Sequence, residues 1–528
     1  MLDRRFLAPH ALARWAERQP DVVALEHVDG ARLTYAELHA EALRWAGAFQ
    51  RSDIEAGRHV GTLLPNEFDA YFTLLGLAWV GAVEVPINTA FTGSMLRYAL
   101  DHADVSVLIT TTAFLDRLVP IVDQLPTLET IVVLDDPEPL GPSTVRTVGR
   151  RELLDGVAAA TDLPGPEHWD VAALLFTSGT TGPSKAVRTP WAVLYQNWSY
   201  IPEDTFGPGE GLFCALPLFH NSGRGAFNCV LARGGRFVMR DKFSATNVWD
   251  DVRRANCIAL ALVGPLTALL YAAQPRPDDA DNPVRHVVLG PMIPEIEDFE
   301  SRFGVKTCVA YGQTEIGVAL ASGWDHGPWA SCGSLRTGYP WPEVRIVDEH
   351  DQPVGPGVVG ELVVRMSAPW AINAGYYKMP EQTADAWRNG WFHTGDALTY
   401  DEHGYYYFVD RMNDAIRRRG ENISSFEVET MVCEHPDVIE CAAIGVGAAH
   451  GDQEILVAVI VTDPERFDPA ELLTFLIPRM PRFMVPRYVE VAADLPRTEA
   501  SARIRKHELR DRGVPESVWD REAAGITV

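Results

Sequence analysis

The apolar positions along the chain follow two different periods. Short continuous apolar runs, typical of buried strands, cover residues 59–64, 82–87, 106–110 and 130–134. Other segments carry apolar residues at helical spacing, as between Leu38 and Phe49, which follow the capping box Thr34-Tyr-Ala-Glu37. Strands that alternate with helices predict parallel β-sheets built from βαβ units.

The longest apolar stretch, residues 71–83, predicts a buried helix, because it is too short to span a bilayer. Asn66 lies just ahead of it and is predicted to be the N-cap. A further apolar run starts at Asp170 and predicts a buried strand that ends at Phe176. An aromatic strand is expected over residues 405–409.

Composition narrows the class of protein. A chain of 528 residues is too long for one core, so two or more domains are expected. The net charge of −26, from 46 basic and 72 acidic residues, argues against nucleic acid or an anionic membrane as partner. The seven cysteines form no Cys-x-x-Cys pair and no apolar signal core follows Met1, so we expect a reduced, cytoplasmic setting without structural zinc.

Residues 174–187 change character abruptly after the predicted strand. Hydroxyl groups come from Thr177, Ser178, Thr180 and Thr181, while Gly179 and Gly182 allow close approach of the backbone and Lys185 adds a mobile charge. Such a turn suits a polyphosphate, although it is not a Walker A loop, which needs adjacent Gly and Lys. A simple polar turn is the alternative interpretation for a Ser/Thr/Gly loop taken alone.

A second motif, Tyr311-Gly-Gln-Thr-Glu315, combines an aromatic face with hard oxygen atoms. The ring can stack on a base, the Thr314 hydroxyl can bind phosphate, and the Glu315 carboxylate can hold Mg²⁺. Taken alone, the same residues fit a glycine turn with a solvated glutamate.

Together with Gly390-Trp-Phe-His-Thr-Gly-Asp396 and Arg417-Arg-Arg-Gly-Glu421, these motifs resemble those of the adenylate-forming superfamily, in the family's order along nearly the whole chain. That superfamily holds acyl- and aryl-CoA ligases, non-ribosomal peptide adenylation domains and luciferases. The resemblance implies an α/β fold. Residues 1–410 would form a large N-terminal domain of doubly wound α/β subdomains with a β-barrel-like segment, 411–413 a hinge, and 414–528 a small mobile α+β lid.

The resemblance also implies residue roles. The turn from Thr177 to Gly182, together with Lys185 and Thr314, would hold the phosphates of ATP. Glu315 would hold the metal. The remaining nucleotide contacts would come from Gly290, Pro291, Tyr311, Gly312, Asp396 and Arg411. Pro291 and Met292 depart from the family's Gly-Ala turn. His220 and Asn221 would face the acid, and Arg419, Gly420 and Glu421 would line the path of the thiol.

One departure concerns the family's catalytic lysine near the C-terminus. Alignment puts Arg503 at its position, while Lys506 follows three residues later. Arginine keeps the charge but not the geometry of an ammonium. Either Arg503 acts in its place, or Lys506 does after a register shift, or the half-reaction itself differs.

The function that the resemblance implies is ATP-dependent activation of a carboxylic acid as an acyl adenylate, with release of pyrophosphate and transfer to CoA. Ligases of the carnitine/crotonobetaine type are most similar. Arg503, Asn413 and Pro291-Met292 motivate an alternative from secondary metabolism, a diazotase that activates nitrite for attack by an aromatic amine. A non-catalytic nucleotide-binding homologue is a third option. The oligomeric state is left open, with a homodimer as one option.

Overall fold

The computed structural model describes residues 2–135, 145–177, 184–290, 293, 295–324, 327–328, 331–411, 415–418, 421–447, 453–496, 504 and 506–528. The chain divides into two compact units. The larger unit comprises residues 1–89, 100–175 and 186–410, and the smaller unit comprises 90–99, 176–185 and 411–528.

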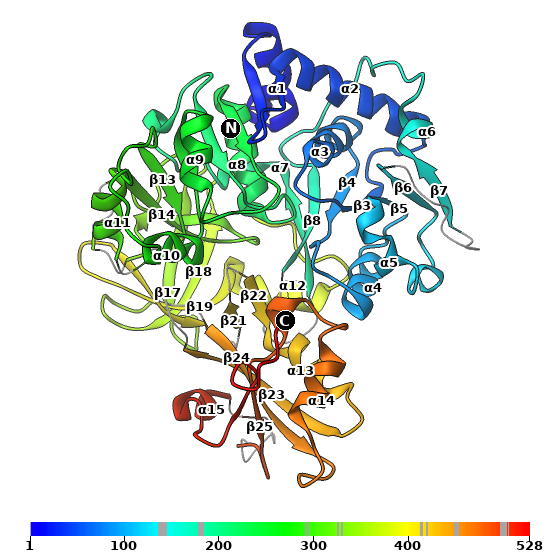
Figure 1. The fold of residues 1–528 in the computed structure, drawn as a ribbon. Helices are drawn as coiled ribbons and strands as arrows, with labels where there is room; N and C mark the ends of the chain where they lie inside the picture. The colour runs from blue at the N-terminus through cyan, green and yellow to red at the C-terminus, as the bar shows by residue number, and fades with distance from the viewer. Residues whose placement is uncertain are drawn as a thin grey trace. The chain divides into compact units, whose positions relative to one another are not determined.

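A seven-stranded sheet carries the first polar turn. Its strands, in spatial order, are β7 (Arg146–Gly149), β6 (Thr130–Val133), β5 (Val107–Thr110), β3 (His59–Leu63), β4 (Val83–Pro86), β8 (Val171–Thr177) and β9 (Lys185–Pro190). Neighbours from β7 to β8 run parallel. In the chain, α3 (Phe68–Val80) joins β3 to β4 and α4 (Gly93–His102) joins β4 to β5. The predicted strands and βαβ units are therefore confirmed, as Figure 1 shows.

Two predicted helix starts have different outcomes. The capping box is confirmed at α2 (Tyr35–Arg51), where the Thr34 hydroxyl accepts from the Glu37 N–H at 3.2 Å and the Glu37 carboxylate accepts from the Thr34 N–H at 2.8 Å. The prediction for Asn66 is wrong, because the N-cap of α3 is Glu67. The Asn66 amide instead donates to the Arg240 carbonyl and accepts from the Tyr71 hydroxyl.

A nine-stranded sheet forms the second layer of the larger unit. Its order is β16 (Ser334–Leu335), β15 (Gly317–Ala321), β14 (Lys306–Gln313), β13 (His286–Leu289), β12 (Cys257–Ala261), β10 (Gly211–Cys214), β11 (Arg236–Met239), β1 (Val23–His27) and β2 (Arg32–Thr34). The six strands from β14 to β1 are parallel, and the strands at both edges are antiparallel. This arrangement is the second of the predicted doubly wound subdomains.

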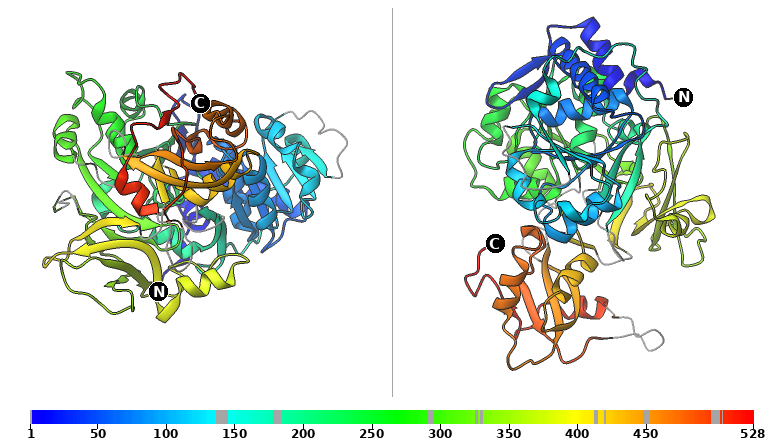
Figure 2. Two further views of the ribbon diagram at one scale, coloured as in Figure 1. Left: turned by 90° about the horizontal axis from the view of Figure 1, so that it is seen from below. Right: turned by 90° about the vertical axis from the view of Figure 1, so that its right-hand side faces the viewer.

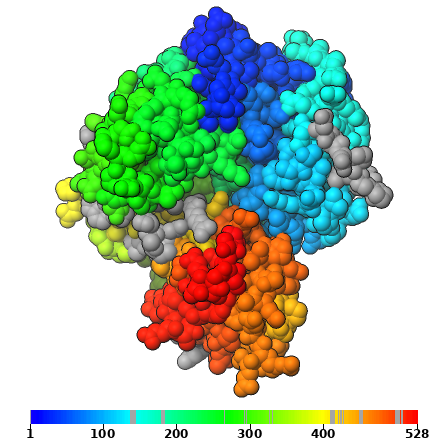
Figure 3. All heavy atoms as spheres, viewed as in Figure 1, coloured from blue at the N-terminus to red at the C-terminus, as the bar shows by residue number. Residues whose placement is uncertain are grey.

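The helices of the larger unit connect these strands. They are α1 (Ala8–Arg18), α5 (Leu115–Leu118), α6 (Arg150–Leu154), α7 (Trp191–Gln196), α8 (Asn221–Arg233), α9 (Val248–Arg254), α10 (Gly264–Ala272) and α11 (Ile296–Phe303). Figures 2 and 3 show α1 and α2, in dark blue, at one exposed end of this unit. Their inner faces bury Leu12, Trp45 and Phe49 in the core.

The predicted barrel-like segment corresponds to a four-stranded sheet. It comprises β17 (Pro342–Val347), β18 (Gly360–Met366), β19 (Phe392–Tyr400) and β20 (Tyr406–Arg411), in that spatial order, with α12 (Pro380–Ala386) between β18 and β19 in the chain. The first three strands are antiparallel neighbours. The chain order equals the spatial order, which defines a meander.

The smaller unit is α+β. Its elements are β21 (Ala415–Arg418), β22 (Glu421–Ser424), α13 (Ser425–Cys433), β23 (Val438–Gly447), β24 (Gln453–Val461), α14 (Pro469–Leu476), β25 (Tyr488–Val491), α15 (Lys506–Arg512) and β26 (Trp519–Asp520). The sheet β23–β24–β25–β26 buries one face against α13 and α14, and the other against Leu495 and Leu509. The α/β fold class with a small α+β C-terminal part is confirmed.

Candidate active site

The first predicted turn joins two neighbouring strands of the seven-stranded sheet. β8 ends at Thr177, one residue beyond the predicted end, and β9 begins at Lys185; both residues are half-buried. Because β8 runs parallel to β4, the turn starts at the carboxyl end of a parallel strand, the usual place for ligands in such sheets. The predicted residues Ser178, Gly179, Thr180, Thr181 and Gly182 lie outside the described residues.

The second motif is the end of β14 and a three-residue turn into β15. Gln313 pairs with Gly317, so Thr314, Glu315 and Ile316 form the turn. A Cβ at Gly312 would lie 2.1 Å from the Gly317 carbonyl oxygen, which explains the glycine at this position. The buried Gln196 of α7 donates to the Ile316 carbonyl at 2.7 Å and so holds the turn in place.

Asp396 of β19 is brought to this motif from far along the chain. Its side chain is 3% exposed, and one carboxylate oxygen accepts from the Tyr311 hydroxyl and from the Gln313 amide, each at 2.7 Å. These charge-assisted bonds fix the direction of the carboxylate. Tyr311 and Asp396, predicted independently as nucleotide ligands, therefore lie in contact.

The part of β19 that precedes Asp396 is held by Glu361 of β18. Its carboxylate accepts from the Gly395 N–H at 2.9 Å, and its second oxygen lies 2.9 Å from Nδ1 of the buried His393. The Thr394 hydroxyl also donates to the Leu362 carbonyl at 2.6 Å. Sequence reasoning missed Glu361 as a positioning residue, although its motif Gly360-Glu-Leu is visible in the sequence.

Glu315 is oriented by two residues that sequence reasoning also missed. Tyr376 donates its hydroxyl to Glu315 Oε1 at 3.2 Å, and Asn373 donates its main-chain and side-chain N–H groups to the Glu315 carbonyl, both at 2.9 Å. Burial, and then the Glu315 charge, raise the pKa of Tyr376 above its usual range, so this hydroxyl remains a proton donor. The Tyr376 segment pairs with Val187 of β9, two residues after Lys185.

The remaining predicted residues of the larger unit lie after strands of the nine-stranded sheet. Gly290 follows β13, and a Cβ there would lie 2.8 Å from the Ala310 carbonyl oxygen; Pro291 and Met292 lie outside the described residues. His220 occupies the N-cap of α8, with its ring 4.7 Å from that of Phe219, and Asn221 is the first residue of α8. Both follow the carboxyl end of β10.

In the smaller unit, the two candidates for the catalytic cation differ. Lys506 begins α15, and its ammonium pairs with Glu429 at 2.6 Å and donates to the Ser425 hydroxyl at 2.8 Å. It is therefore engaged inside this unit. Arg503, Asn413, Arg419 and Gly420 lie outside the described residues, while Arg411 ends β20 and Glu421 begins β22.

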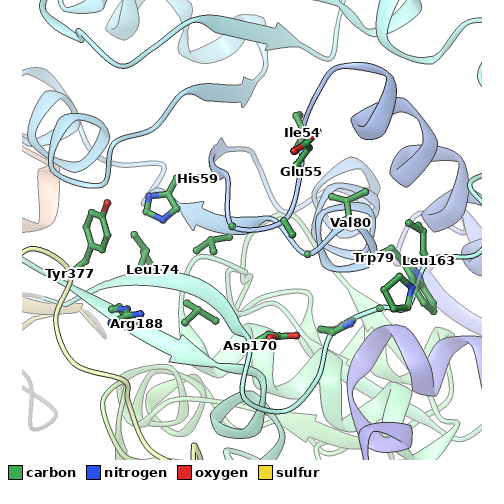
Figure 4. Close-up of a pocket in the computed structure, with 18 of the residues that line it drawn as sticks. Ile54, Glu55, His59, Trp79, Val80, Leu163, Asp170, Leu174, Arg188 and Tyr377 are labelled. Carbon is green, nitrogen blue, oxygen red and sulfur yellow. The ribbon is translucent and has the colours of Figure 1, made fainter.

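A hollow of about 1110 Å³ lies beside the first half of β8 (Figure 4). Its walls include Asp170, His59 and Trp79, and Asp170 immediately precedes β8. Leu174 of β8 and Tyr376, whose hydroxyl donates to Glu315, also line it. Of the described residues that line it, none is a predicted site residue.

Comparison with known proteins decides the family. The family model described as AMP-binding enzyme matches residues 12–377, and the model of the AMP-binding enzyme C-terminal domain matches residues 427–501. The chain belongs to the AMP-binding enzymes. The predicted membership of the adenylate-forming superfamily is confirmed.

Curated relatives of this AMP-binding enzyme support the same family. A crotonobetaine/carnitine–CoA ligase from Salmonella enteritidis PT4 is 31% identical over 493 residues, which cover 91% of this chain and 93% of the relative. The ligase of the same name from Salmonella typhimurium is 30% identical over 491 residues, with the same shares covered.

Solved structures confirm the fold. The o-succinylbenzoate CoA synthetase from Bacillus subtilis has a TM-score of 0.82 at 24% identity and covers 95% of this chain and 98% of its own. The amide bond synthetase McbA from Marinactinospora thermotolerans has a TM-score of 0.82 at 26% identity, with 96% and 100% covered. These proteins lend no support to the nitrite-activating alternative.

The predicted absence of a membrane span can be compared with the helices of the structure. In the ranges that the structure describes, no helix combines the length and the apolar character needed to cross a bilayer.

Proposed function

We propose that this AMP-binding enzyme activates a carboxylic acid as its acyl adenylate and transfers the acyl group to CoA. The observation that carries the proposal is the joining of Tyr311, Gln313 and Asp396 by two 2.7 Å hydrogen bonds on the strand that leads into the Glu315 turn. A fixed aromatic ring on β14, an oriented carboxylate on β19 and a second carboxylate in the turn after β14 suit a nucleoside with a phosphate chain.

The nucleotide would be bound by the residues named from the sequence. The turn from Thr177 to Gly182, with Lys185 and Thr314, holds the phosphates; Gly290, Pro291, Tyr311 and Gly312 line the base; Asp396 and Arg411 take the ribose hydroxyls. The chain contributes positioning and electrostatic stabilisation, because the transferring phosphoryl group needs little covalent help.

Glu315 is the residue that would hold Mg²⁺. ATP-dependent sites commonly bind this ion through one or two carboxylates together with substrate phosphates, so a single oriented glutamate fits it. When bound, the ion offsets charge on the phosphates. The bonds from Tyr376 and Asn373 hold the glutamate turn in position for that role.

For the cation that stabilises the reacting phosphate, we favour Arg503 over Lys506. The ammonium of Lys506 is paired with the half-buried Glu429 and bonded to Ser425. Withdrawing it would leave a largely desolvated carboxylate unpaired, which costs stability. Arg503 keeps a positive charge at the position that the family resemblance assigns to the lysine.

The acid and the thiol would approach from two sides. His220 and Asn221, at the start of α8, face the acid, and Arg419, Gly420 and Glu421 lie along the path of CoA. The relatives named as CoA ligases support CoA as the acceptor. The smaller domain, from about residue 414, would move between the two half-reactions about a hinge at 411–413.

Product analysis tests this proposal. The purified enzyme is incubated with MgATP, CoA and a panel of carboxylic acids, and the products are identified by mass spectrometry. We expect an acyl-CoA thioester, AMP and pyrophosphate in equal amounts. An acyl amide formed from an added amine, with CoA left unchanged, would contradict CoA as the acceptor while preserving the adenylation step.

A further inference from the structure

One stripe of α8 carries buried polar atoms that are not satisfied within the described part of the protein. They are Asn221 Oδ1, Arg224 Nη2, and both Nδ2 and Oδ1 of Asn228. Residues spaced by three, four and seven positions lie on the same side of a helix, so these side chains form one row. Arg224 is 1% exposed and Asn228 is 4% exposed.

Buried polar groups in native proteins are nearly always hydrogen-bonded, because leaving one unpaired costs stability. Asn228 has a donor and an acceptor, and neither finds a partner among the described residues. A leucine of similar size would avoid that cost. A row of such groups therefore points to a ligand that completes their bonding.

Two of the three nitrogen atoms of the Arg224 guanidinium donate hydrogen bonds within the protein. Its Nη1 donates to Glu84 Oε2 at 2.7 Å, and its Nε donates to the Leu218 carbonyl at 3.2 Å. The other Glu84 oxygen accepts from the Thr62 hydroxyl at 2.7 Å, so the carboxylate is satisfied. The ion pair is close to neutral as a whole, and what remains on it is a donor, Nη2.

The row also begins at the predicted acid-binding end of the helix. Leu218, which accepts from Arg224, lies two residues before His220, and the Arg224 N–H donates to the His220 carbonyl at 3.2 Å. A helix rises 1.5 Å per residue, so Asn228 lies roughly 10 Å beyond Asn221. A ligand that enters at His220 would therefore meet Arg224 before Asn228.

We propose that Arg224 and Asn228 bind a hydrogen-bond acceptor oxygen on the part of the activated acid remote from its reacting carboxylate. This inference rests on the proposed adenylation of a carboxylic acid and adds its substrate class: acids with a second oxygen function, such as a ketone, a phenol or a second carboxylate. A trimethylammonium group, as in crotonobetaine, offers no acceptor and would face the positive end of the N–H bonds of Nη2. The substrate therefore differs from the one named for the relatives.

The test compares acids of matched size in acid-dependent pyrophosphate exchange. The pairs are levulinate against valerate, glutarate against valerate, and para-coumarate against cinnamate, with crotonobetaine as the cationic acid. We expect at least one oxygen-bearing acid to exceed its apolar partner in kcat/KM by about ten- to a hundredfold, the effect of one bond to a charged donor. Crotonobetaine is expected to be the poorest.

Asn228→Leu separates binding from structure. It removes both unsatisfied atoms and keeps the branched shape of the side chain, so a purely structural Asn228 predicts a higher melting temperature and unchanged acid selectivity. We expect the preference for the oxygen-bearing acid to fall about tenfold or more, through KM for the acid, with KM for ATP unchanged. Cys229→Ala, at a buried neighbouring position of α8, is the control and should leave the preference intact.

Arg224 is tested together with Glu84, because removing the arginine alone would leave a buried carboxylate unpaired. The double variant Glu84→Gln/Arg224→Gln should lose the preference as Asn228→Leu does. An unchanged preference in both variants, or a wild-type preference for valerate and cinnamate, would overturn the inference while leaving adenylation in place. No exchange with any acid would instead contradict the proposed function.

Discussion

Tyr376 and Tyr377 are adjacent tyrosines with different hydrogen-bond partners. The Tyr376 hydroxyl donates to Glu315 at 3.2 Å, whereas the Tyr377 hydroxyl donates to Asp104 at 2.8 Å. If Glu315 holds the metal of MgATP, Tyr376→Phe should lower kcat/KM for MgATP by roughly tenfold, since one bond to a charged group is lost. Steady-state kinetics with Tyr377→Phe as matched control measure this, and equal losses in both variants would argue against the role of Glu315.

The two candidate cations near the C-terminus can be separated at the level of single residues. Arg503→Ala should reduce acid-dependent pyrophosphate exchange by about a hundredfold, the usual effect of losing one donor at a transferring phosphate. Lys506→Met should instead destabilise the smaller unit by about 1–3 kcal/mol, because the half-buried Glu429 loses its partner at 2.6 Å.

The double variant Lys506→Met/Glu429→Leu provides the control, since it removes both charges. We expect it to regain most of the melting temperature and to retain exchange activity. Exchange activity that disappears in this folded double variant but survives in Arg503→Ala would assign the cation to Lys506.

At the scale of secondary structure, the start of α2 depends on local bonds between Thr34 and Glu37. Thr34→Ala should lower the free energy of unfolding of the larger unit by about 1 kcal/mol, measured by chemical denaturation. Thr34→Ser keeps the capping oxygen and should lose little. Similar losses in both variants would show that the cap contributes less than its geometry suggests.

Three helices meet around Trp79 of α3, which contacts His10 of α1 and His39 of α2. Burial lowers the pKa of both histidines below the usual value of 6.5. The folded state therefore favours their neutral forms, so stability is complete above about pH 6.5 and declines as the pH falls below it. His10→Gln/His39→Gln should reduce the fall in melting temperature between about pH 7.5 and 5.5. The exposed His350→Gln is the control and should follow the wild-type protein.

The elements that sequence patterns predicted are those fixed by local chemistry. Strand β8 and the capping box of α2 depend on residues a few positions apart, and both are confirmed. Asn66 was predicted from the same kind of rule, but its amide bonds to Arg240, far along the chain. A long-range partner of that kind leaves no local signal.

The candidate site shows the same difference between residues with a local sequence signal and residues that depend on distant partners. Tyr311, Glu315 and Asp396 were found through the resemblance of their motifs, because each lies in a short characteristic string. Gln196, Asn373 and Glu84 act through partners brought near by the sheets, and nothing in their local sequence indicates this. Motifs therefore predicted the groups that we propose to bind the nucleotide, and the fold was needed to find the residues that hold them.

At the scale of the whole molecule, both sheets contribute residues around the Glu315 turn of the larger unit. The nine-stranded sheet carries this turn after β14, and the seven-stranded sheet carries Val187 on β9. β9 links them, since its Val187 pairs with Tyr376, whose hydroxyl reaches Glu315. This arrangement suits a nucleotide bound at the carboxyl ends of parallel strands.

The most direct test of the central claim is exchange of labelled pyrophosphate into ATP by the full-length enzyme, with and without acid and CoA. Formation of a bound acyl adenylate predicts exchange that requires Mg²⁺ and a carboxylic acid but not CoA, and AMP release that requires both acid and CoA. Exchange that is absent with every acid tested, or AMP release that is independent of the acid, would contradict the account.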